Sequence, residues 1–139
     1  MTGPLWQRIN ARPRLSLAGA ISAAELPSKP GVYAFYREGA AVYVGKAKRL
    51  NGRLRTNHLS RGVSLTNSAL RRNVAEALGI ASAADIKAHR YRPTSEEAAN
   101  VADWIRACQV AWIECATEAD AITLEKAMKR EWMPPLTKQ

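Results

Sequence analysis

The stretch from Gly31 to Arg53 reads GVYAFYREGAAVYVGKAKRLNGR, and the rest of the chain is interpreted outward from it. Two short runs rich in Val, Tyr and Phe, Val32–Tyr36 and Ala41–Gly45, flank the tripeptide Arg37-Glu38-Gly39. Such residues suit a pleated surface, and glycine suits a turn that needs a positive φ. The pattern therefore predicts a β-hairpin.

The length of the hairpin loop decides which faces of the sheet the two tyrosines occupy. A three-residue loop with Gly39 left-handed places Tyr33 directly opposite Tyr43. A two-residue loop pairs Tyr33 with Val44 and separates the phenols. Because Glu-Gly lacks the Asn or Asp that the tighter turn prefers, we favour the three-residue loop, which presents two phenols side by side.

A cluster of cations follows the hairpin, on a predicted helix whose buried side is Leu50 and Leu54. Paired phenols beside clustered cations suit a substrate that carries phosphate. The cluster comprises Lys46, Lys48, Arg49, Arg53 and Arg55.

The composition of the whole chain favours the same class of substrate. Its 139 residues have a formal net charge of +9, which favours a polyanionic partner, nucleic acid first and an acidic membrane surface second. The alternative is that the charge only keeps the protein soluble. No apolar run reaches the roughly 18 residues of a membrane helix, so no membrane partner is expected. Cys108 and Cys115 lack C-x-x-C spacing and predict reduced core residues in a cytoplasmic protein.

The first 25 residues are interpreted as a helical N-terminal extension to a domain of residues 26–139. Three arginines precede Leu15–Ala24, a run that resembles a secretory signal. Serine and glycine interrupt that run, so we favour a short helix packed on the domain.

Helical patterns occupy most of the span between the hairpin and the next strand-like run. Ser64–Arg92 is expected to be helical with a stop at Gly79, although Ser82–Arg92 is compatible with either a helix or a strand. Thr94 with Glu97 three residues on predicts a capping box at the start of another helix.

A strand and a final helix complete the predicted elements. Gln109–Cys115 alternates as a strand does, and a helix is expected from near Thr117 to about Trp132. On that helix Glu125 lies about 40° from Ala121, at the edge of the packed stripe. A carboxylate there is costly unless it is paired or bound to a cation, and from helix geometry alone an ordinary salt bridge is the favoured explanation.

The two triplets Gly31-Val32-Tyr33 and Tyr43-Val44-Gly45 resemble the signature triplets of the GIY-YIG nucleases. Lys46 follows the second triplet and Arg53 stands ten residues after Tyr43, as the basic positions of that family do. The lead-in Leu26–Pro30 is similar to that of the family's branch in bacterial nucleotide-excision repair. The resemblance implies an α/β (α+β) domain with a small three-stranded antiparallel sheet flanked by helices. Its strands would be Gly31–Arg37, Ala41–Gly45 and Gln109–Cys115, with extra helices inserted before the third.

The resemblance also implies a metal-dependent endonuclease that hydrolyses phosphodiester bonds in nucleic acid, with DNA favoured over RNA. Glu125 matches the metal-binding Glu of the family and would hold Mg²⁺ or Mn²⁺. Tyr33 or Tyr43 would take a proton from the attacking water, and we expect Tyr43 to matter more because Lys46 nearby favours its phenolate. Arg53 would neutralise charge on the phosphate. Further contacts to nucleic acid are expected from Lys48, Arg49, Arg55, His58, Arg90 and Arg92.

Three departures from the family pattern stand beside the resemblance. Thr137 stands where the family often has Asn, and Asn57, followed by His58, stands where it has Tyr or His. The span from Tyr43 to Glu125 is also longer than in compact members.

Three other functions are compatible with a basic chain of this size. A phosphate-binding loop is excluded because Ala40 and Ala47 replace the residues it needs. A Ser/His/Asp hydrolase lacks a nucleophile-elbow motif. The alternative from another class is a catalytically silent module that binds nucleic acid through its basic face.

Overall fold

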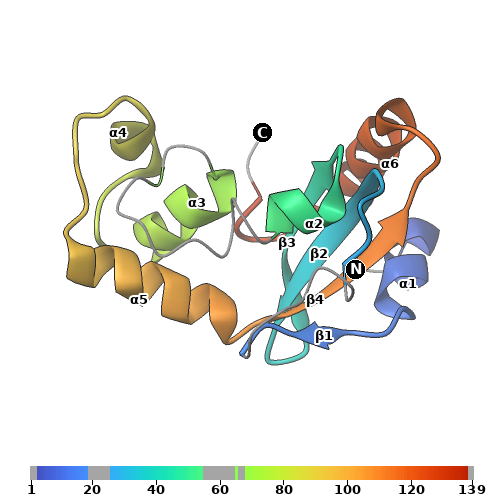
Figure 1. The fold of residues 1–139 in the computed structure, drawn as a ribbon, viewed down its shortest axis with the longest axis horizontal. Coiled ribbons are helices and arrows are strands. Elements are labelled where there is room, and N and C mark those ends of the chain that lie inside the picture. The colour runs from blue at the N-terminus through green and yellow to red at the C-terminus, as the bar shows by residue number, and fades with distance from the viewer. Residues whose placement is uncertain (1–2, 19–25, 55–64, 66–67, 138–139) are drawn as a thin grey trace.

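Figure 1 shows the computed structural model of the chain, which describes residues 3–18, 26–54, 65 and 68–137. The elements follow in the order α1 (Pro4–Asn10), β1 (Leu15–Ser16), β2 (Gly31–Arg37), β3 (Ala40–Ala47), α2 (Leu50–Gly52), α3 (Ala69–Ala77), α4 (Ala83–Lys87), α5 (Ser95–Arg106), β4 (Gln109–Glu114) and α6 (Glu118–Glu131). A twisted sheet with α1, α2 and α6 forms one part of the molecule, and α3 to α5 extend to its side (Figure 1).

The sheet is antiparallel throughout, and over the described residues its strands are ordered β1-β4-β2-β3. The predicted fold class, a mixed α/β domain with an antiparallel sheet, is confirmed. The predicted number of strands is wrong, because β1 adds a fourth by pairing Leu15 with Val110 and Ser16 with Gln109. A strand of two residues is too short to produce an alternating pattern, and here it replaces the start of the helix expected over Leu15–Ala24.

The hairpin closes with a two-residue turn, and the prediction of a three-residue loop is wrong. Arg37 pairs with Ala40, and both loop residues have positive φ, 53° at Glu38 and 83° at Gly39. Positive φ at both positions is the requirement of the type I′ turn, whose twist matches that of the strands. The twist of the hairpin thus outweighs the weak preference of Glu for this conformation.

A β-bulge restores the arrangement of the phenols that the tighter turn would have lost. The register shifts between Phe35 and Tyr36, leaving Val42 as the extra residue of β3, so Tyr33 pairs with Gly45. Tyr33 and Tyr43 are therefore diagonal neighbours on one face, with ring centroids 6.3 Å apart. The expectation that they face each other directly is wrong, but the expectation of two phenols side by side is confirmed.

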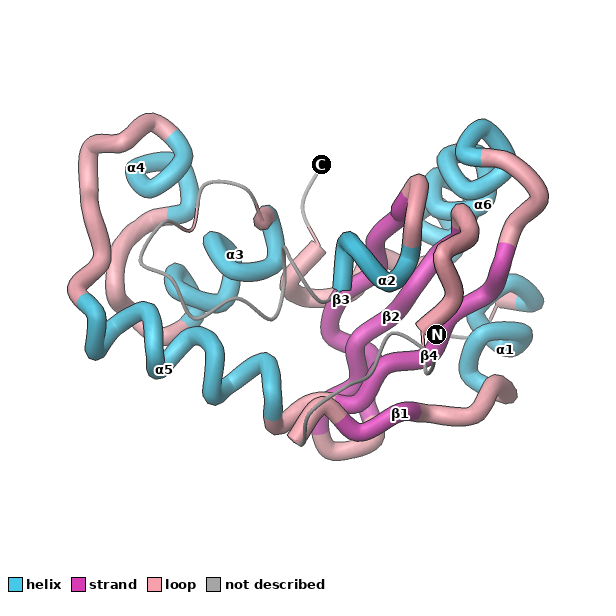
Figure 2. The backbone as a smooth tube through the Cα atoms, in the orientation of Figure 1, coloured by secondary structure: helices cyan, strands magenta, loops and turns pink. Residues whose placement is uncertain are grey.

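The two faces of the sheet are covered by different helices (Figure 2). One face carries Tyr33 and Tyr43, packed in a core with apolar side chains of α2, α3 and α5. The other carries Val32 and Val44, packed against side chains of α1 and α6. Because alternate residues of a strand point to opposite faces, the central strand β2 is buried on both.

Helix α1 packs on the end of α6. The fully buried indole of Trp6 donates from Nε1 to the carbonyl oxygens of Met128 and Trp132, at 2.9 and 3.1 Å. In the other direction the Glu131 carboxylate accepts from the backbone N–H groups of Leu5 and Trp6. The Glu131 carboxylate thus satisfies unpaired N–H groups in the first turn of α1, and the indole of Trp6 binds carbonyl groups at the end of α6, so the two helix ends are held together.

The remaining helices follow their sequence signals. Helix α3 ends before Gly79, whose φ is 78°, and α4 shows that Ser82–Arg92 contains a helix rather than a strand. The capping box of Thr94 and Glu97 begins α5 as predicted. Throughout the ranges that the structure describes, no helix combines the length and the apolar character needed to cross a membrane.

Candidate active site

The site begins at the pair formed by Tyr33 and Gly45. The phenol of Tyr33 is fully buried and lies directly over Gly45, so close that a Cβ atom at position 45 would collide with its hydroxyl group. Only glycine leaves room for the ring at this position. The last residue of the second triplet is therefore required by the first tyrosine.

The two phenols titrate in unequal surroundings. Burial raises the pKa of Tyr33 well above its ordinary value, and the neighbouring Tyr43 raises it further. Burial also raises the pKa of Tyr43. The charge of Arg53 acts to lower the pKa of both phenols, and a hydrogen bond from Tyr33 acts to lower that of Tyr43 further. Tyr33 is therefore the phenol that keeps its proton, and Tyr43 is the more easily ionised of the two.

Arg53 reaches the phenols from the turn that continues α2, and its guanidinium donates a hydrogen bond to Tyr33. The start of α2 is held by the lead-in loop, because Leu50 N donates to Lys29 O and Asn51 N to Pro27 O, both at 3.0 Å. Buried Leu50 and Leu54 complete its packing as predicted. The lead-in loop thus fixes the helix from which Arg53 extends.

Glu125 lies on α6 with its carboxylate close enough to the phenols to raise the pKa values of both Tyr33 and Tyr43. The residue is buried, with 7% of its surface exposed. Its Oε1 atom forms an ion pair with Lys129 Nζ, 3.1 Å away and one helical turn further on. From the sequence, Glu125 was expected either to bind a cation or to form a salt bridge. The structure shows a salt bridge made by the same carboxylate that would bind the cation.

Lys46 extends from the face of the sheet opposite Tyr43. It stands three positions after Tyr43 on β3, opposite Val32, so its exposed side chain leaves the other face of the sheet. The cations that lower the pKa of Tyr43 are Arg53 and Arg72. The electrostatic effect expected of Lys46 therefore comes from these two arginines.

The donor set around Glu125 fits a hard divalent cation bound mainly by substrate and water. Among the residues that the structure describes, no three His, Cys, Asp or Glu side chains come together as a metal cluster. A single carboxylate suffices for magnesium, which commonly keeps several waters and binds substrate phosphates. The buried carboxylate of Glu125, which already pairs with a positive charge, can supply this single ligand.

Comparison with protein families decides the relationship of the chain. Residues 21–139 match the model of the GIY-YIG catalytic domain. The chain belongs to the GIY-YIG family. The recognition made from the two triplets is thus confirmed, and with it the enzyme class of the domain, a GIY-YIG-type phosphodiester endonuclease.

Two proteins named UvrABC system protein C and solved UvrC domains are similar to this chain. UvrABC system protein C of Thermotoga petrophila and that of Thermotoga maritima are each 57% identical over 30 residues, 22% of this chain and 5% of theirs. The chain thus matches only a small part of these relatives. The N-terminal GIY-YIG endonuclease domain of UvrC from Thermotoga maritima, solved with its catalytic magnesium, has a TM-score of 0.47 at 20% identity over 99% of this chain and 100% of that one. A point mutant of that domain gives 0.47 at 19% identity, covering 100% of both chains.

The C-terminal tail binds to β3 through Thr137 and Leu136. The hydroxyl group of Thr137 accepts from Val44 N at 2.9 Å, and Leu136 N donates to Val42 O at 2.9 Å. The tail therefore pairs with the outer edge of β3 on both sides of Tyr43. Such pairing covers an edge strand and holds the strand in register.

Helix α3, from the long span that separates the two halves of the GIY-YIG pattern, also reaches this site. Asn73 Nδ2 donates to Leu136 O at 2.7 Å, which fastens the helix to the tail. Its neighbour Arg72 lies near enough to Tyr43 and Arg53 for their charges to interact. No sequence signal marks Arg72, Asn73 or Lys129. Each reaches the site through contacts between distant segments or through a side chain whose direction is fixed only when the helix is packed.

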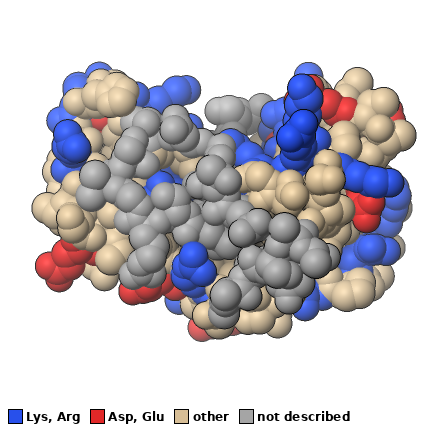
Figure 3. All heavy atoms as spheres, in the orientation of Figure 1, with Lys and Arg blue, Asp and Glu red and all other residues tan. Residues whose placement is uncertain are grey.

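The predicted cations for nucleic acid are distributed over the surface. Lys and Arg atoms lie over the end of the molecule that carries α2 and α6 and over the end that carries α4 (Figure 3). Lys48, Arg49 and Arg92 are exposed. Arg55 and His58, with Asn57, lie outside the described residues.

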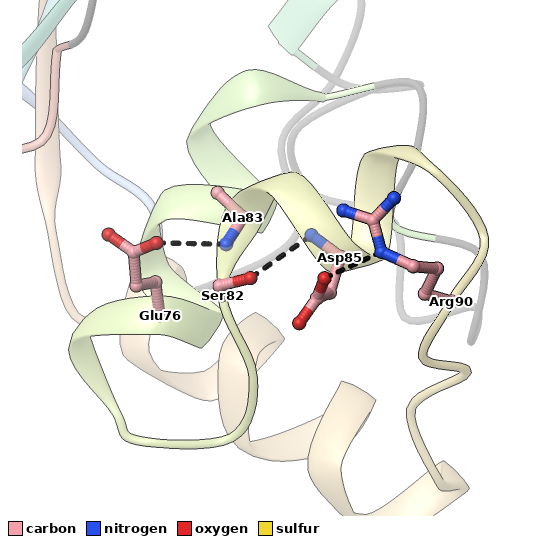
Figure 4. A network of polar contacts seen from close by, with 5 residues as sticks. All are labelled: Glu76, Ser82, Ala83, Asp85 and Arg90. Atoms are coloured by element: carbon pink, nitrogen blue, oxygen red, sulfur yellow. Dashed lines mark hydrogen bonds and ion pairs between the residues drawn. The ribbon is translucent and has the colours of Figure 1, made fainter.

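Arg90 is exposed but already paired. Its Nε atom donates to Asp85 Oδ1 at 2.8 Å, and the side chains of Arg90 and Asp85 are 64% and 46% exposed (Figure 4). Asp85 N in turn donates to Ser82 Oγ, the N-cap of α4. An exposed pair of this kind is weak, so the guanidinium can exchange its carboxylate for a phosphate.

Proposed function

We propose that this chain is a divalent-cation-dependent endonuclease that hydrolyses phosphodiester bonds in nucleic acid, with DNA as its substrate. The observation that carries the proposal is the meeting of two buried phenols, Arg53 and the buried carboxylate of Glu125 at one place. A proton acceptor, a cation for phosphate and a ligand for a metal ion are the groups that metal-assisted phosphodiester hydrolysis needs.

Tyr43 is the proposed general base. A phenol accepts a proton only as its phenolate, so the less strongly perturbed of the two tyrosines is the better base. Arg53 and Arg72 act to lower the pKa of Tyr43, and Tyr33 donates a hydrogen bond that stabilises the phenolate. Tyr33, whose own pKa is raised well above the ordinary value, serves as that donor.

Glu125 is the proposed ligand of Mg²⁺ or Mn²⁺. When bound, such an ion supplies Lewis-acid stabilisation to a phosphate oxygen and to the leaving oxygen. Arg53, beside both phenols, would neutralise the charge that develops on the other phosphate oxygens. Hydrogen bonds from Trp6 hold the end of α6, the helix that would present this carboxylate to the ion.

Exposed cations would hold the polyanionic strand around this site. Lys48 and Arg49 adjoin α2, and Arg92 with Arg90 lies beyond α4. Lys46, exposed on the other face, would contribute to binding rather than to the proton transfer. The free thiols Cys108 and Cys115 support the proposal of a reducing location, the cytoplasm.

The experiment that tests the proposal is an assay of supercoiled plasmid relaxation by the purified chain. Nicked or linear product is expected with MgCl₂ or MnCl₂, and none with EDTA. Parallel gel-shift measurements record binding in both conditions. Binding without cleavage at any concentration of either ion would contradict the proposal and leave the catalytically silent module in its place.

A further inference from the structure

The ion pair between Lys129 and Glu125 involves the one residue proposed to bind a cation. Nζ lies 3.1 Å from Oε1, and the exposed fractions of the two side chains are 20% for Lys129 and 9% for Glu125. Burial of a lone carboxylate is unfavourable, so a positive partner at this place stabilises the folded chain. Lys129 supplies that partner from the same helix.

A divalent cation and Lys129 cannot both use this carboxylate without cost. If the ion takes Oε1, the ammonium group loses its partner. If the ion takes the other oxygen, two positive charges lie on opposite sides of one carboxylate and repel each other in surroundings that screen them weakly. In either arrangement the lysine opposes the binding of the ion.

We propose that Lys129 sets the cation affinity of the site by competing with the divalent ion for Glu125. The inference rests on the proposed function, because it takes Glu125 as the metal ligand. Lysine suits the task, since its charge is carried on a flexible stem that can turn toward solvent without unfolding the helix. The stem of Lys129 is only partly exposed, so it remains packed while the ammonium group moves.

Competition has a reciprocal consequence for the lysine. If Lys129 lowers the affinity of Glu125 for the ion by a given factor, the bound ion weakens the pairing of Lys129 with Glu125 by the same factor. The released ammonium group then lies one helical turn from the metal ligand, where a phosphate of the substrate can accept it.

The test measures Mn²⁺ affinity in the full chain without nucleic acid, from the free-ion signal in electron paramagnetic resonance, with Mg²⁺ as the competing ion. Lys129→Met removes the charge and keeps the stem, and is expected to bind Mn²⁺ about three- to tenfold more tightly than wild type. Lys126→Met is the matched control, because it removes the same charge one residue from Glu125 on an exposed side chain.

Thermal unfolding in EDTA gives a second readout. Lys129→Met is expected to lower Tm by about 3–6 °C because it leaves a buried carboxylate without its partner, and saturating Mn²⁺ should then raise Tm more than in wild type. Lys129→Gln serves if the Met variant fails to fold.

The outcomes separate the inference from the proposed function. Equal tightening in Lys126→Met and Lys129→Met would show a general field effect and overturn the inference. Unchanged or weaker Mn²⁺ binding in folded Lys129→Met would overturn it as well. If Glu125→Gln binds Mn²⁺ as tightly as wild type, the metal lies elsewhere and the proposed function itself fails at this residue.

Discussion

The hairpin with α2 and the inserted helices α3 to α5 contribute to the same site in different ways. The hairpin presents Tyr33, Tyr43 and Gly45 within one short stretch of chain, and α2 adds Arg53 directly after it. Helix α3 contributes by long-range contacts only, through Asn73 to the tail and through the charge of Arg72 near Tyr43. The phenols and Arg53 therefore come from a local motif, whereas Glu125 on α6 and the contacts of α3 come from distant segments.

The largest expected effect falls on the hairpin side. Tyr43→Phe keeps the ring and removes the hydroxyl group, and should lower the single-turnover cleavage rate by about 10²–10⁴ if Tyr43 is the base. Its raised pKa predicts a rate that rises with pH into the alkaline range, because the phenolate increases as pH approaches the raised value. The variant should lose this rising limb in a pH–rate profile.

Tyr33→Phe is the matched variant for that measurement. It should retain a rising limb displaced to higher pH, because the hydrogen bond that lowers the pKa of Tyr43 is lost. A near-normal rate in Tyr43→Phe with a large loss in Tyr33→Phe would reverse the two roles. No loss in either variant would make both tyrosines structural.

On the side of the inserted helices, Asn73→Ala tests the attachment of α3 to the tail. It leaves the carbonyl group of Leu136 without its donor at a partly buried place, and should lower the free energy of unfolding by about 1–3 kcal/mol. Urea unfolding monitored by circular dichroism measures the change. Asn100→Ala, on the exposed side of α5, should change it by less than about 0.5 kcal/mol. Equal losses of unfolding free energy in the two variants would show that the hydrogen bond from Asn73 to the tail does not stabilise the fold.

Arg72→Gln tests whether α3 adjusts the chemistry. Loss of its charge should raise the pKa of Tyr43, displace the rising limb of the pH–rate profile upward and reduce the rate at neutral pH by about five- to tenfold. Arg72→Lys should restore most of the rate. Arg90→Gln, which removes a cation from the same group of helices, should leave the profile in place. An unchanged profile in Arg72→Gln would confine the chemistry to the hairpin.

The smallest expected effect concerns the surface cations, whose contributions to binding are individually modest. With about four to six phosphates contacted, log K for a DNA duplex should fall with log[salt] at a slope of about −4 to −5. Removing one contacting cation, as in Arg49→Gln, should reduce the slope by about 1 across unrelated sequences. Fluorescence anisotropy from 50 to 300 mM KCl measures it, and affinity independent of salt would exclude this surface as the binding face.

The sequence predicted the parts of the fold whose signals are local. Two strand-like runs parted by Glu-Gly, the stop at Gly79 and the capping box at Thr94 each depend on neighbouring residues, and each is present in the structure. The strand β1 was missed because its pairing with β4 depends on residues almost a hundred positions away. The bulge at Val42 was missed because nothing in the hairpin sequence marks it.

The candidate site divides in the same way. The positions of Tyr33, Tyr43, Arg53 and Glu125 were expected from motif spacing and from one helical stripe, and the structure brings all four together. The catalytic role of Lys46 stays a prediction, and a three-residue step along β3 directs its side chain to the face opposite Tyr43. Sequence spacing gives the neighbours of a residue along an element, whereas packing between elements decides which charge meets which phenol.

The central claim is that Glu125 binds the ion that makes the phenol pair catalytic. Single-turnover cleavage of labelled DNA by Glu125→Gln, with saturating Mg²⁺ and a parallel binding measurement, tests it most directly. The substitution keeps the shape of the side chain and removes the charge that would hold the ion. The account predicts loss of cation-dependent cleavage with DNA binding retained or slightly tighter. Cleavage at the wild-type rate by the folded variant would contradict it.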